Sequence, residues 1–156
     1  MSANGSVAAG TTRPLVRDIM IGQVHTVHQD APMNHAASVM GQYGIRHLVV
    51  INGMEQPVGI ISERDLLRHI AHSLSRGVNV PGRVPVRELM ISVPFTVRPE
   101  TPLARASAIL ATKKIGCVPV VDDRTRLAGI ISVVDVLKYV AAHELSEKDI
   151  LAASEP

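Results

Sequence analysis

Apolar positions recur at helical spacing in two parts of the chain, and each part follows a short β-branched run. The runs are Thr26-Val27 and Thr96-Val97, which suit brief strands. A proline stands a few residues after each run, at positions 32 and 102, where it suits the first turn of a helix. The apolar side chains beyond the prolines repeat every three or four positions, which predicts helices. They are Ala36, Val39, Met40 and Tyr43 in the first part and Ala106, Ile109 and Leu110 in the second.

Two dense apolar segments follow each predicted helix. In the first part they span 48–51 and 57–61 and are joined through Asn52-Gly53; in the second they span 118–121 and 127–131 and are joined through Asp122-Asp123. A polar turn between two strand-like runs, above all Asn-Gly, indicates a hairpin. A further helix is predicted at about 63–75 and again at about 133–144. The order in each part is therefore strand, helix, strand, strand, helix, which indicates a mixed α/β (α+β) fold.

The two parts are copies of one unit. Residues 59–65 read GIISERD and residues 129–135 read GIISVVD, 70 positions apart, and VRDIMI at 16–21 matches VRELMI at 86–91 at the same interval. The match needs no gap over about fifty positions, so the chain holds a tandem structural repeat. We expect a disordered N-terminal arm at 1–14, a first unit at 15–74, a linker at 75–85, a second unit at 86–144 and a C-terminal tail at 145–156.

The amino-acid composition restricts the kind of core and the cellular compartment that we expect for the two units. Apolar residues make up 46% of the chain but aromatic residues only 2%, so the core must be built from aliphatic side chains. The single Cys117 excludes an internal disulfide and fits a reducing compartment. No apolar run approaches the roughly 20 residues of a membrane span, and the N-terminus lacks the pattern of a secretory signal. We therefore expect a soluble cytoplasmic protein. A net charge of +2, without a long basic cluster, does not favour nucleic-acid binding.

The repeated Gly-Ile-Ile-Ser-x-x-Asp segment has two interpretations. Ser62 with Asp65, and Ser132 with Asp135, each fit a capping box at the start of a helix. The same side chains could also bind a ligand, because a helix N-terminus favours an anion. The hydroxyl would contact a phosphate and the carboxylate would accept hydrogen bonds from a ribose diol, which together describe a nucleotide. The residues alone leave both interpretations open.

The doubled pattern resembles a known family. VRDIM, the Thr-Val, Pro and Ala run, the paired apolar strands and Gly-h-h-Ser-x-x-Asp-h-h, where h is apolar, are similar to the cystathionine-beta-synthase-type (CBS) domain over about residues 15–142. Two such units form the pair known as a Bateman module. The resemblance implies two tandem units packed sheet to sheet with pseudo-twofold symmetry. It also implies a regulatory homodimer that is not an enzyme. The pair would bind AMP, ADP or ATP, or else NAD or S-adenosylmethionine, between its units and act on a separate downstream protein.

The resemblance also assigns residues to two clefts. Ser62 and Asp65 would bind phosphate and ribose in one cleft, and Ser132 and Asp135 in the other. Thr26, Val27, Thr96 and Val97 would flank the adenine. Ile45, Arg46 and His47 would face the site of Asp135, and Ile115, Gly116 and Cys117 would face the site of Asp65. Arg46 and His47 would then give the Asp135 site a preference for the more phosphorylated ligand; the alternative is that Arg46 is an ordinary exposed charge.

The sequence gives little support for a metal site at its two histidine pairs or for a redox role of its cysteine. His25 with His28, and His69 with His72, have spacings that could hold a metal, but no third ligand stands nearby and we expect no metal. Cys117 is expected to be a small packed residue rather than a redox sensor. No pairing of a nucleophile with a base and no Gly-rich phosphate loop indicates catalysis.

The helix predicted at 133–144 is apolar around much of its circumference. Its apolar residues are Val133, Val134, Val136, Leu137, Val140 and Ala141. Such a helix needs a covering surface, which could be the other unit or a second copy of the chain. Besides a nucleotide sensor, the sequence therefore leaves open a dimerisation scaffold that binds no ligand and, with less support, a DNA-associated regulator.

Overall fold

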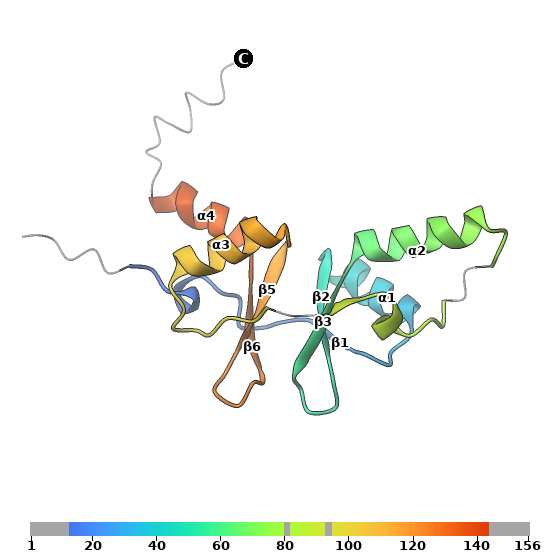
Figure 1. Cartoon of the computed structure of the whole chain (residues 1–156), viewed down its shortest axis with the longest axis horizontal. Coiled ribbons are helices and arrows are strands. Elements are labelled where there is room, and N and C mark those ends of the chain that lie inside the picture. The colour runs from blue at the N-terminus through green and yellow to red at the C-terminus, as the bar shows by residue number, and fades with distance from the viewer. Residues whose placement is uncertain (1–12, 80–81, 93–94, 144–156) are drawn as a thin grey trace, which may run out of the picture.

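The computed structural model describes residues 13–79, 82–92 and 95–143, and Figure 1 shows its two repeats. The first repeat contains a short 3-10 helix η1 (Val16–Asp18), β1 (Thr26–His28), α1 (Met33–Tyr43), β2 (His47–Ile51), β3 (Pro57–Ser62) and α2 (Glu63–Ser75). The second contains η2 (Val86–Glu88), β4 (Ile91–Ser92), α3 (Leu103–Lys113), β5 (Cys117–Val121), β6 (Leu127–Ser132) and α4 (Val133–His143). The predicted mixed fold is confirmed. Residues 1–12 of the expected arm, 80–81 of the linker and the expected tail at 145–156 lie outside the described residues.

The strand predicted at Thr96-Val97 is reduced to a single bridge, in which Val97 pairs with Val120. The amide of Val121 donates to the carbonyl of Val97 at 2.9 Å. In a parallel ladder the preceding bond would need the amide of residue 119, which is a proline and has no N–H. The first repeat has Val49 at that position, and there β1 pairs with β2 over three residues. The proline therefore explains why the second repeat has the shorter pairing.

The two hairpins of the molecule lie side by side, and the helices of each repeat lie on the outer side of its own hairpin (Figure 1). The first sheet has the strand order β1-β2-β3-β4, with β1 parallel to β2 and the other pairs antiparallel; the second sheet is the hairpin β5-β6. The hairpin turns contact each other. Gln56 donates a side-chain hydrogen bond of 2.9 Å to Thr125, and the amide of Leu127 donates to the carbonyl of Glu55 at 3.3 Å.

Each repeat encloses an aliphatic core, as the composition predicted. The first core contains Val27, Met33, Ala36, Met40, Leu48, Val50, Ile61, Leu66 and Val86. The second contains Val16, Val97, Leu103, Ala106, Leu110, Val118, Val120 and Ile131. The helical spacing of the sequence thus brings one face of α1 and one face of α3 onto their sheets.

The segments that begin the two repeats are exchanged between the cores. Val86 belongs to the second repeat by sequence but is fully buried in the first core, where its amide donates to the carbonyl of Ala31 at 2.9 Å. Val16 is likewise fully buried in the second core, and its amide donates to the carbonyl of Thr101 at 2.9 Å. Strand β4 continues the exchange by pairing with β3. Each core is therefore completed by residues that begin the other repeat.

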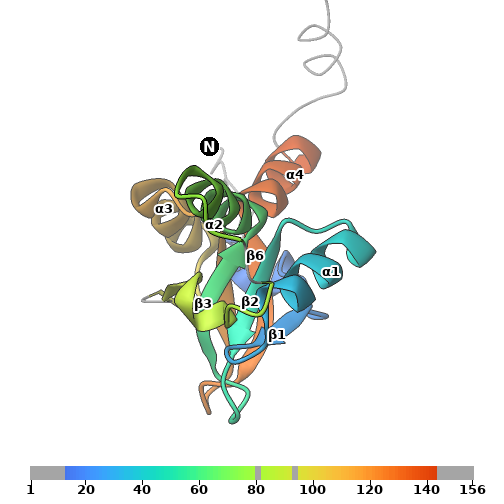
Figure 2. The same cartoon turned by 90° about the vertical axis from the view of Figure 1, so that its right-hand side faces the viewer.

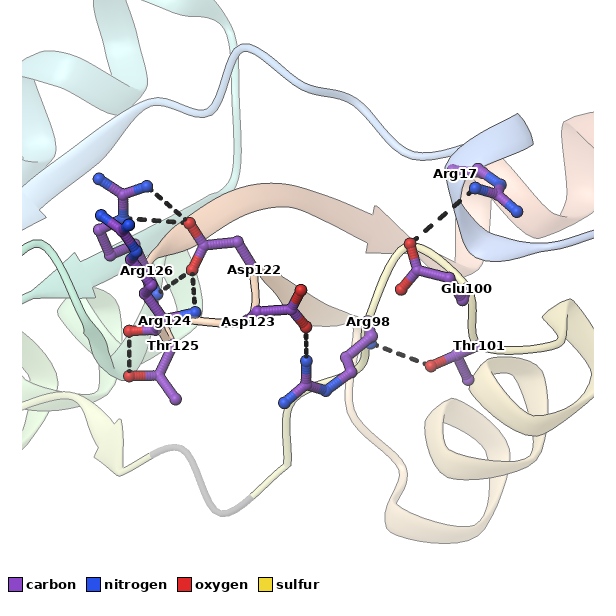
Figure 3. A network of polar contacts seen from close by, with 9 residues as sticks. All are labelled: Arg17, Arg98, Glu100, Thr101, Asp122, Asp123, Arg124, Thr125 and Arg126. Carbon is purple, nitrogen blue, oxygen red and sulfur yellow. Dashed lines mark hydrogen bonds and ion pairs between the residues drawn. The ribbon is translucent and has the colours of Figure 1, made fainter.

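Charged side chains flank this exchange in symmetric pairs. Arg87 binds Asp30, and Arg17 lies 3.9 Å from Glu100 (Figure 3). The arginines are 70 positions apart in the sequence, and so are the two acids. These exposed pairs are worth little stability individually, but they show that both exchanged segments sit in the same way.

The turn between β5 and β6 carries a second group of ion pairs (Figure 3). Arg98 binds Asp123, and Arg126 lies 2.9 Å from Asp122. Hydrogen bonds from the backbone and side chain of Arg126 lower the pKa of Asp122. These charged side chains are therefore paired with one another at the turn.

Helix α4 presents an exposed apolar surface. Val133, Val134, Leu137 and Val140 are between 39% and 60% exposed, so the other repeat does not cover this helix. Figure 2 shows α4 at the margin of the molecule. In the part of the chain that the structure describes, no helix is long and apolar enough to cross a membrane.

Candidate functional site

A cleft of about 1120 Å³ lies between the two repeats, where the junction of β3 and α2 faces the end of α3 and the start of β5. From the first repeat it is lined by Arg46, His47, Ile60, Ser62, Glu63, Arg64, Asp65, Leu67 and Arg68. From the second it is lined by Ile91, Ser92, Phe95, Leu110, Ala111, Lys113, Lys114, Ile115, Gly116, Cys117 and Val133. A ligand large enough to span it would contact both repeats at once.

Ser62 and Asp65 lie in this cleft and also form a capping box. The Ser62 hydroxyl and the Ser62 amide both donate to Oδ2 of Asp65, at 2.5 and 2.9 Å, and the Asp65 amide donates to the Ser62 hydroxyl at 3.3 Å. The predicted cap is confirmed. The cap uses only one carboxylate oxygen, since Oδ1 of Asp65 instead accepts a long bond of 3.4 Å from exposed Arg68. A ligand hydroxyl could replace that weak contact without breaking the cap.

Ser132 and Asp135 repeat the same geometry at the start of α4. The Ser132 hydroxyl and amide donate to Oδ2 of Asp135 at 2.5 and 2.8 Å, and the Asp135 amide donates back at 3.2 Å. Neither residue is among those that line the cleft. The second pair is therefore a confirmed helix cap, and its role in a second cleft stays a prediction.

Five cationic side chains surround the cleft: Arg46, Arg64, Arg68, Lys113 and Lys114, all exposed. They outnumber the two carboxylates, Glu63 and Asp65. The Nζ atom of Lys113 lies 4.9 Å from the ring centre of Phe95, a cation–π contact. Burial and the nearby Arg46 lower the pKa of His47, which keeps its imidazole neutral near pH 7. The site is therefore electropositive and suits an anion.

The two turns that were expected to face opposite clefts meet in this one. Ile115, Gly116 and Cys117 line it together with Asp65, the arrangement that we expected. Arg46 and His47 were expected opposite Asp135, but they also line the Asp65 cleft. The reason is strand register: His47 pairs with Ser62 across the β2–β3 hairpin, and the Arg46 carbonyl accepts from the Glu63 amide at 3.0 Å. Ile45 packs against the first core and is not a lining residue.

The residues expected to flank adenine are not among the lining residues. Val27 and Val97 are buried in the two cores, because an alternating strand turns its apolar side chains inward. Thr26 is half-buried and Thr96 is exposed. Phe95, which the sequence analysis did not select, lines the cleft instead. Arg64, Arg68 and Ile91 were missed as well; the spacing of Arg64 and Arg68 around Asp65 on one helix was the available signal.

The histidine pairs have other surroundings. His25 stacks on Tyr43 with ring centres 3.8 Å apart, and the Asp30 amide donates to Nδ1 of His28 at 3.2 Å. His69 and His72 line a small hollow of about 230 Å³ beside α2. Within the described ranges, no three His, Cys, Asp or Glu side chains are placed to hold a metal ion.

Comparison with known proteins defines the class. The family model of the CBS domain matches residues 16–72 and 86–142, so the chain belongs to this family and carries two tandem domains. An uncharacterised protein of Methanopyrus kandleri is 31% identical over 128 residues, which cover 79% of this chain and 63% of that protein. The chain spans smaller shares, 25% and 32%, of the next two curated relatives.

Two solved structures with the same fold contain adenosyl ligands. The CBS domain pair of protein MJ0100, in complex with 5′-methylthioadenosine and S-adenosyl-L-methionine, is 25% identical with a TM-score of 0.71 and covers 83% of this chain and 98% of that one. CBSX2 in complex with AMP is 26% identical with a TM-score of 0.72 and covers 84% of this chain and 98% of that one. These two neighbours of the fold thus both hold small adenosyl compounds.

Proposed function

We propose that this CBS pair is a regulatory module, without catalytic activity of its own, that binds an adenine nucleotide or a related adenosyl ligand in the cleft at Ser62 and Asp65. The observation that carries the proposal is the position of this pair: its hydroxyl and carboxylate line a cleft of about 1120 Å³ that both repeats build. The adenosyl ligands of the two solved neighbours support the ligand class.

The lining suggests a role for each part of the ligand. Oδ1 of Asp65 would accept hydrogen bonds from the ribose hydroxyls in place of its long contact with Arg68. The cationic side chains and the N-terminus of α2 would stabilise phosphate groups. Ile91 and Phe95 from the second repeat would provide the apolar surface for adenine.

A ligand in this position would couple the two repeats. Because the lining residues belong to both, binding favours the arrangement of the repeats that closes on the ligand. The resulting bias cannot exceed the ligand's difference in affinity for the two arrangements, typically about 1–3 kcal/mol. A downstream protein in the cytoplasm, or a longer chain that includes this module, would respond to that change.

Thermal unfolding with a panel of AMP, ADP, ATP, NAD and S-adenosylmethionine tests the proposal. A ligand at a hundred times its Kd should raise the free energy of unfolding by about 2.7 kcal/mol. Asp65→Asn should abolish this stabilisation, since the variant loses the charge that faces the ribose.

The matched control is Asp135→Asn. It weakens an identical helix cap but leaves the cleft lining unchanged, so ligand stabilisation should persist. No stabilisation of the wild-type protein by any compound would contradict the proposal and favour a ligand-free scaffold. Loss of binding in Asp135→Asn but not in Asp65→Asn would move the site to the second repeat.

Exposed apolar residues support a second part of the function, homodimerisation through α2 and α4. Leu74 on α2 is 64% exposed and Leu137 on α4 is 60% exposed. Light scattering should report a dimer for the wild-type protein and a monomer for Leu137→Lys. Met54→Lys, at an exposed residue in a hairpin turn, is the control and should stay dimeric. A wild-type monomer would contradict this part.

A further inference from the structure

Resting on the proposed function, we infer that the cleft selects ligands by their phosphate charge, and that it takes a nucleoside diphosphate or triphosphate in preference to a monophosphate. The inference concerns the Ser62–Asp65 cleft alone. Three observations support it. The cleft has several cationic side chains, these side chains belong to different elements of both repeats, and most of the residues 70 positions away in the sequence are not cationic.

The five cationic side chains of the cleft come from three parts of the fold. Arg46 stands in the turn before β2, and Arg64 and Arg68 project from the first turns of α2. In the other repeat, Lys113 ends α3 and Lys114 follows it as the helix cap. Of these five side chains, Arg68 is the one that forms an ion pair with a carboxylate among the described residues. The others remain available to a ligand, and a chain of phosphates is long enough to contact cations of both repeats at once.

The positive charge that lines the cleft is greater than one phosphate group can neutralise. Five cationic side chains face two carboxylates in the lining, and one of these, Asp65, already accepts the hydrogen bonds of the helix cap. A single phosphate carries roughly one and a half to two negative charges near pH 7. A monophosphate would therefore leave part of the cationic cluster without an anion, whereas a diphosphate or triphosphate would engage more of it.

The other repeat shows that the fold does not require these charges. The residues 70 positions away are Gly116 for Arg46, Val134 for Arg64, Lys138 for Arg68, Tyr43 for Lys113 and Gly44 for Lys114. Only one of the five matching residues is cationic, although both repeats form the same helices and hairpins. The cluster is thus a property of this cleft rather than of the repeated architecture.

Lys114 gives the clearest case. It occupies the left-handed backbone region with a φ of +53°, as Gly44 does at the equivalent helix end with a φ of +61°. Glycine is the residue that suits this conformation. A lysine at the mouth of the cleft, in a position that favours glycine, is explained if its charge is needed for the ligand.

Calorimetric titration of the wild-type protein with AMP, ADP and ATP, in chelator-treated buffer, tests the inference. Affinity should increase from AMP to ATP by about tenfold in total, on the scale of several exposed ion pairs. The gain for ATP should shrink steeply with added salt, because exposed charges are screened. The variant Lys113→Gln/Lys114→Gln should reduce the ATP-to-AMP ratio to about twofold.

Arg105→Gln is the matched control, since it removes an exposed charge from the same helix α3 outside the cleft and should keep the wild-type ratio. If the double variant does not fold, the salt series on the wild-type protein decides. Equal or tighter binding of AMP than of ATP, at low salt, would overturn the inference and leave the proposed function intact. Failure of every nucleotide and of S-adenosylmethionine to bind would overturn both.

Discussion

The imidazole of His47 lies against Gly116 of the other repeat, so close that a β-carbon at position 116 would stand 2.9 Å from Nε2. The turn of one repeat thus contacts the turn of the other inside the cleft. The absence of a side chain at Gly116 is what allows this approach, because any Cβ would overlap the ring.

Gly116→Ala should therefore displace the His47 ring. We expect a loss of about 0.5–1.5 kcal/mol in the free energy of unfolding, the cost of an unfavourable rotamer, measured by urea denaturation. Gly41→Ala is a control of opposite sign, because Gly41 lies in α1 with no atom within 4 Å of the added Cβ. It should stabilise the protein by roughly 0.5–1 kcal/mol. Equal effects of the two changes would contradict this account of the turn.

Lys114→Gly should separate stability from binding. The left-handed conformation of Lys114 costs about 1–2 kcal/mol, and the greater freedom of glycine in the unfolded chain offsets part of the gain. We expect a net stabilisation of roughly 0.5–1 kcal/mol in urea together with weaker ATP binding. The reverse change, Gly44→Lys, should destabilise the protein. A destabilised Lys114→Gly variant would show that the lysine side chain supports the fold.

The lowered pKa of His47 makes stability depend on pH. Burial is the main cause and the charge of Arg46 adds to it, while Asp65 acts in the opposite direction. The unfolded chain takes up a proton at this residue near pH 6.5, whereas the folded protein takes it up only at lower pH. The free energy of unfolding should therefore fall as the pH drops below about 6.5.

Urea denaturation of the wild-type protein and His47→Gln at several pH values measures this effect. The wild type should lose more stability than the variant between pH 6.5 and 5, by at most about 1.4 kcal/mol per pH unit. Between pH 7 and 8.5 the difference between the two proteins should be constant. Identical curves across the acidic range would exclude a contribution from His47.

Cys117 should be chemically inert in the folded protein. It is 2% exposed, and burial, with a smaller contribution from the charge of Asp135, raises its thiol pKa to about 12. Since the thiolate is the reactive form, a disulfide reagent at pH 8 should label the native protein far more slowly than the urea-unfolded chain. Labelling at similar rates in both states would mean that the start of β5 opens readily.

The repeated architecture could be predicted because apolar spacing and a constant interval of 70 positions both survive in the sequence. The exchange of the segments that begin the two repeats could not be predicted. VRDIMI and VRELMI are nearly identical, so either one could cover either core as far as the pattern shows. The hairpin turn was also predicted only in outline: Asn52-Gly53 marks it, yet the residue with positive φ is Glu55.

The lining of the candidate cleft was predictable where one short segment carries it. Ser62 and Asp65 stand three positions apart, and the turn at 115–117 was expected beside them. Phe95 and Arg64 reach the same cleft only through the packing of the two repeats, which no local pattern encodes. Arg46 also lines the Asp65 cleft, which was not expected, because the β2–β3 register decides its position and register depends on the hairpin turn.

The exchanged segments also set an order of events during synthesis of the chain. The first core can close as soon as η2 and β4 have left the ribosome, because Val86 fills it. Residue 16 emerges much earlier, yet its place is beside the second core, and Ile21 bridges to Ile130. The segment at residues 16–21 must therefore remain unattached until the second repeat has been synthesised as far as β6, so closure of the second core joins two parts of the chain that are made far apart in time.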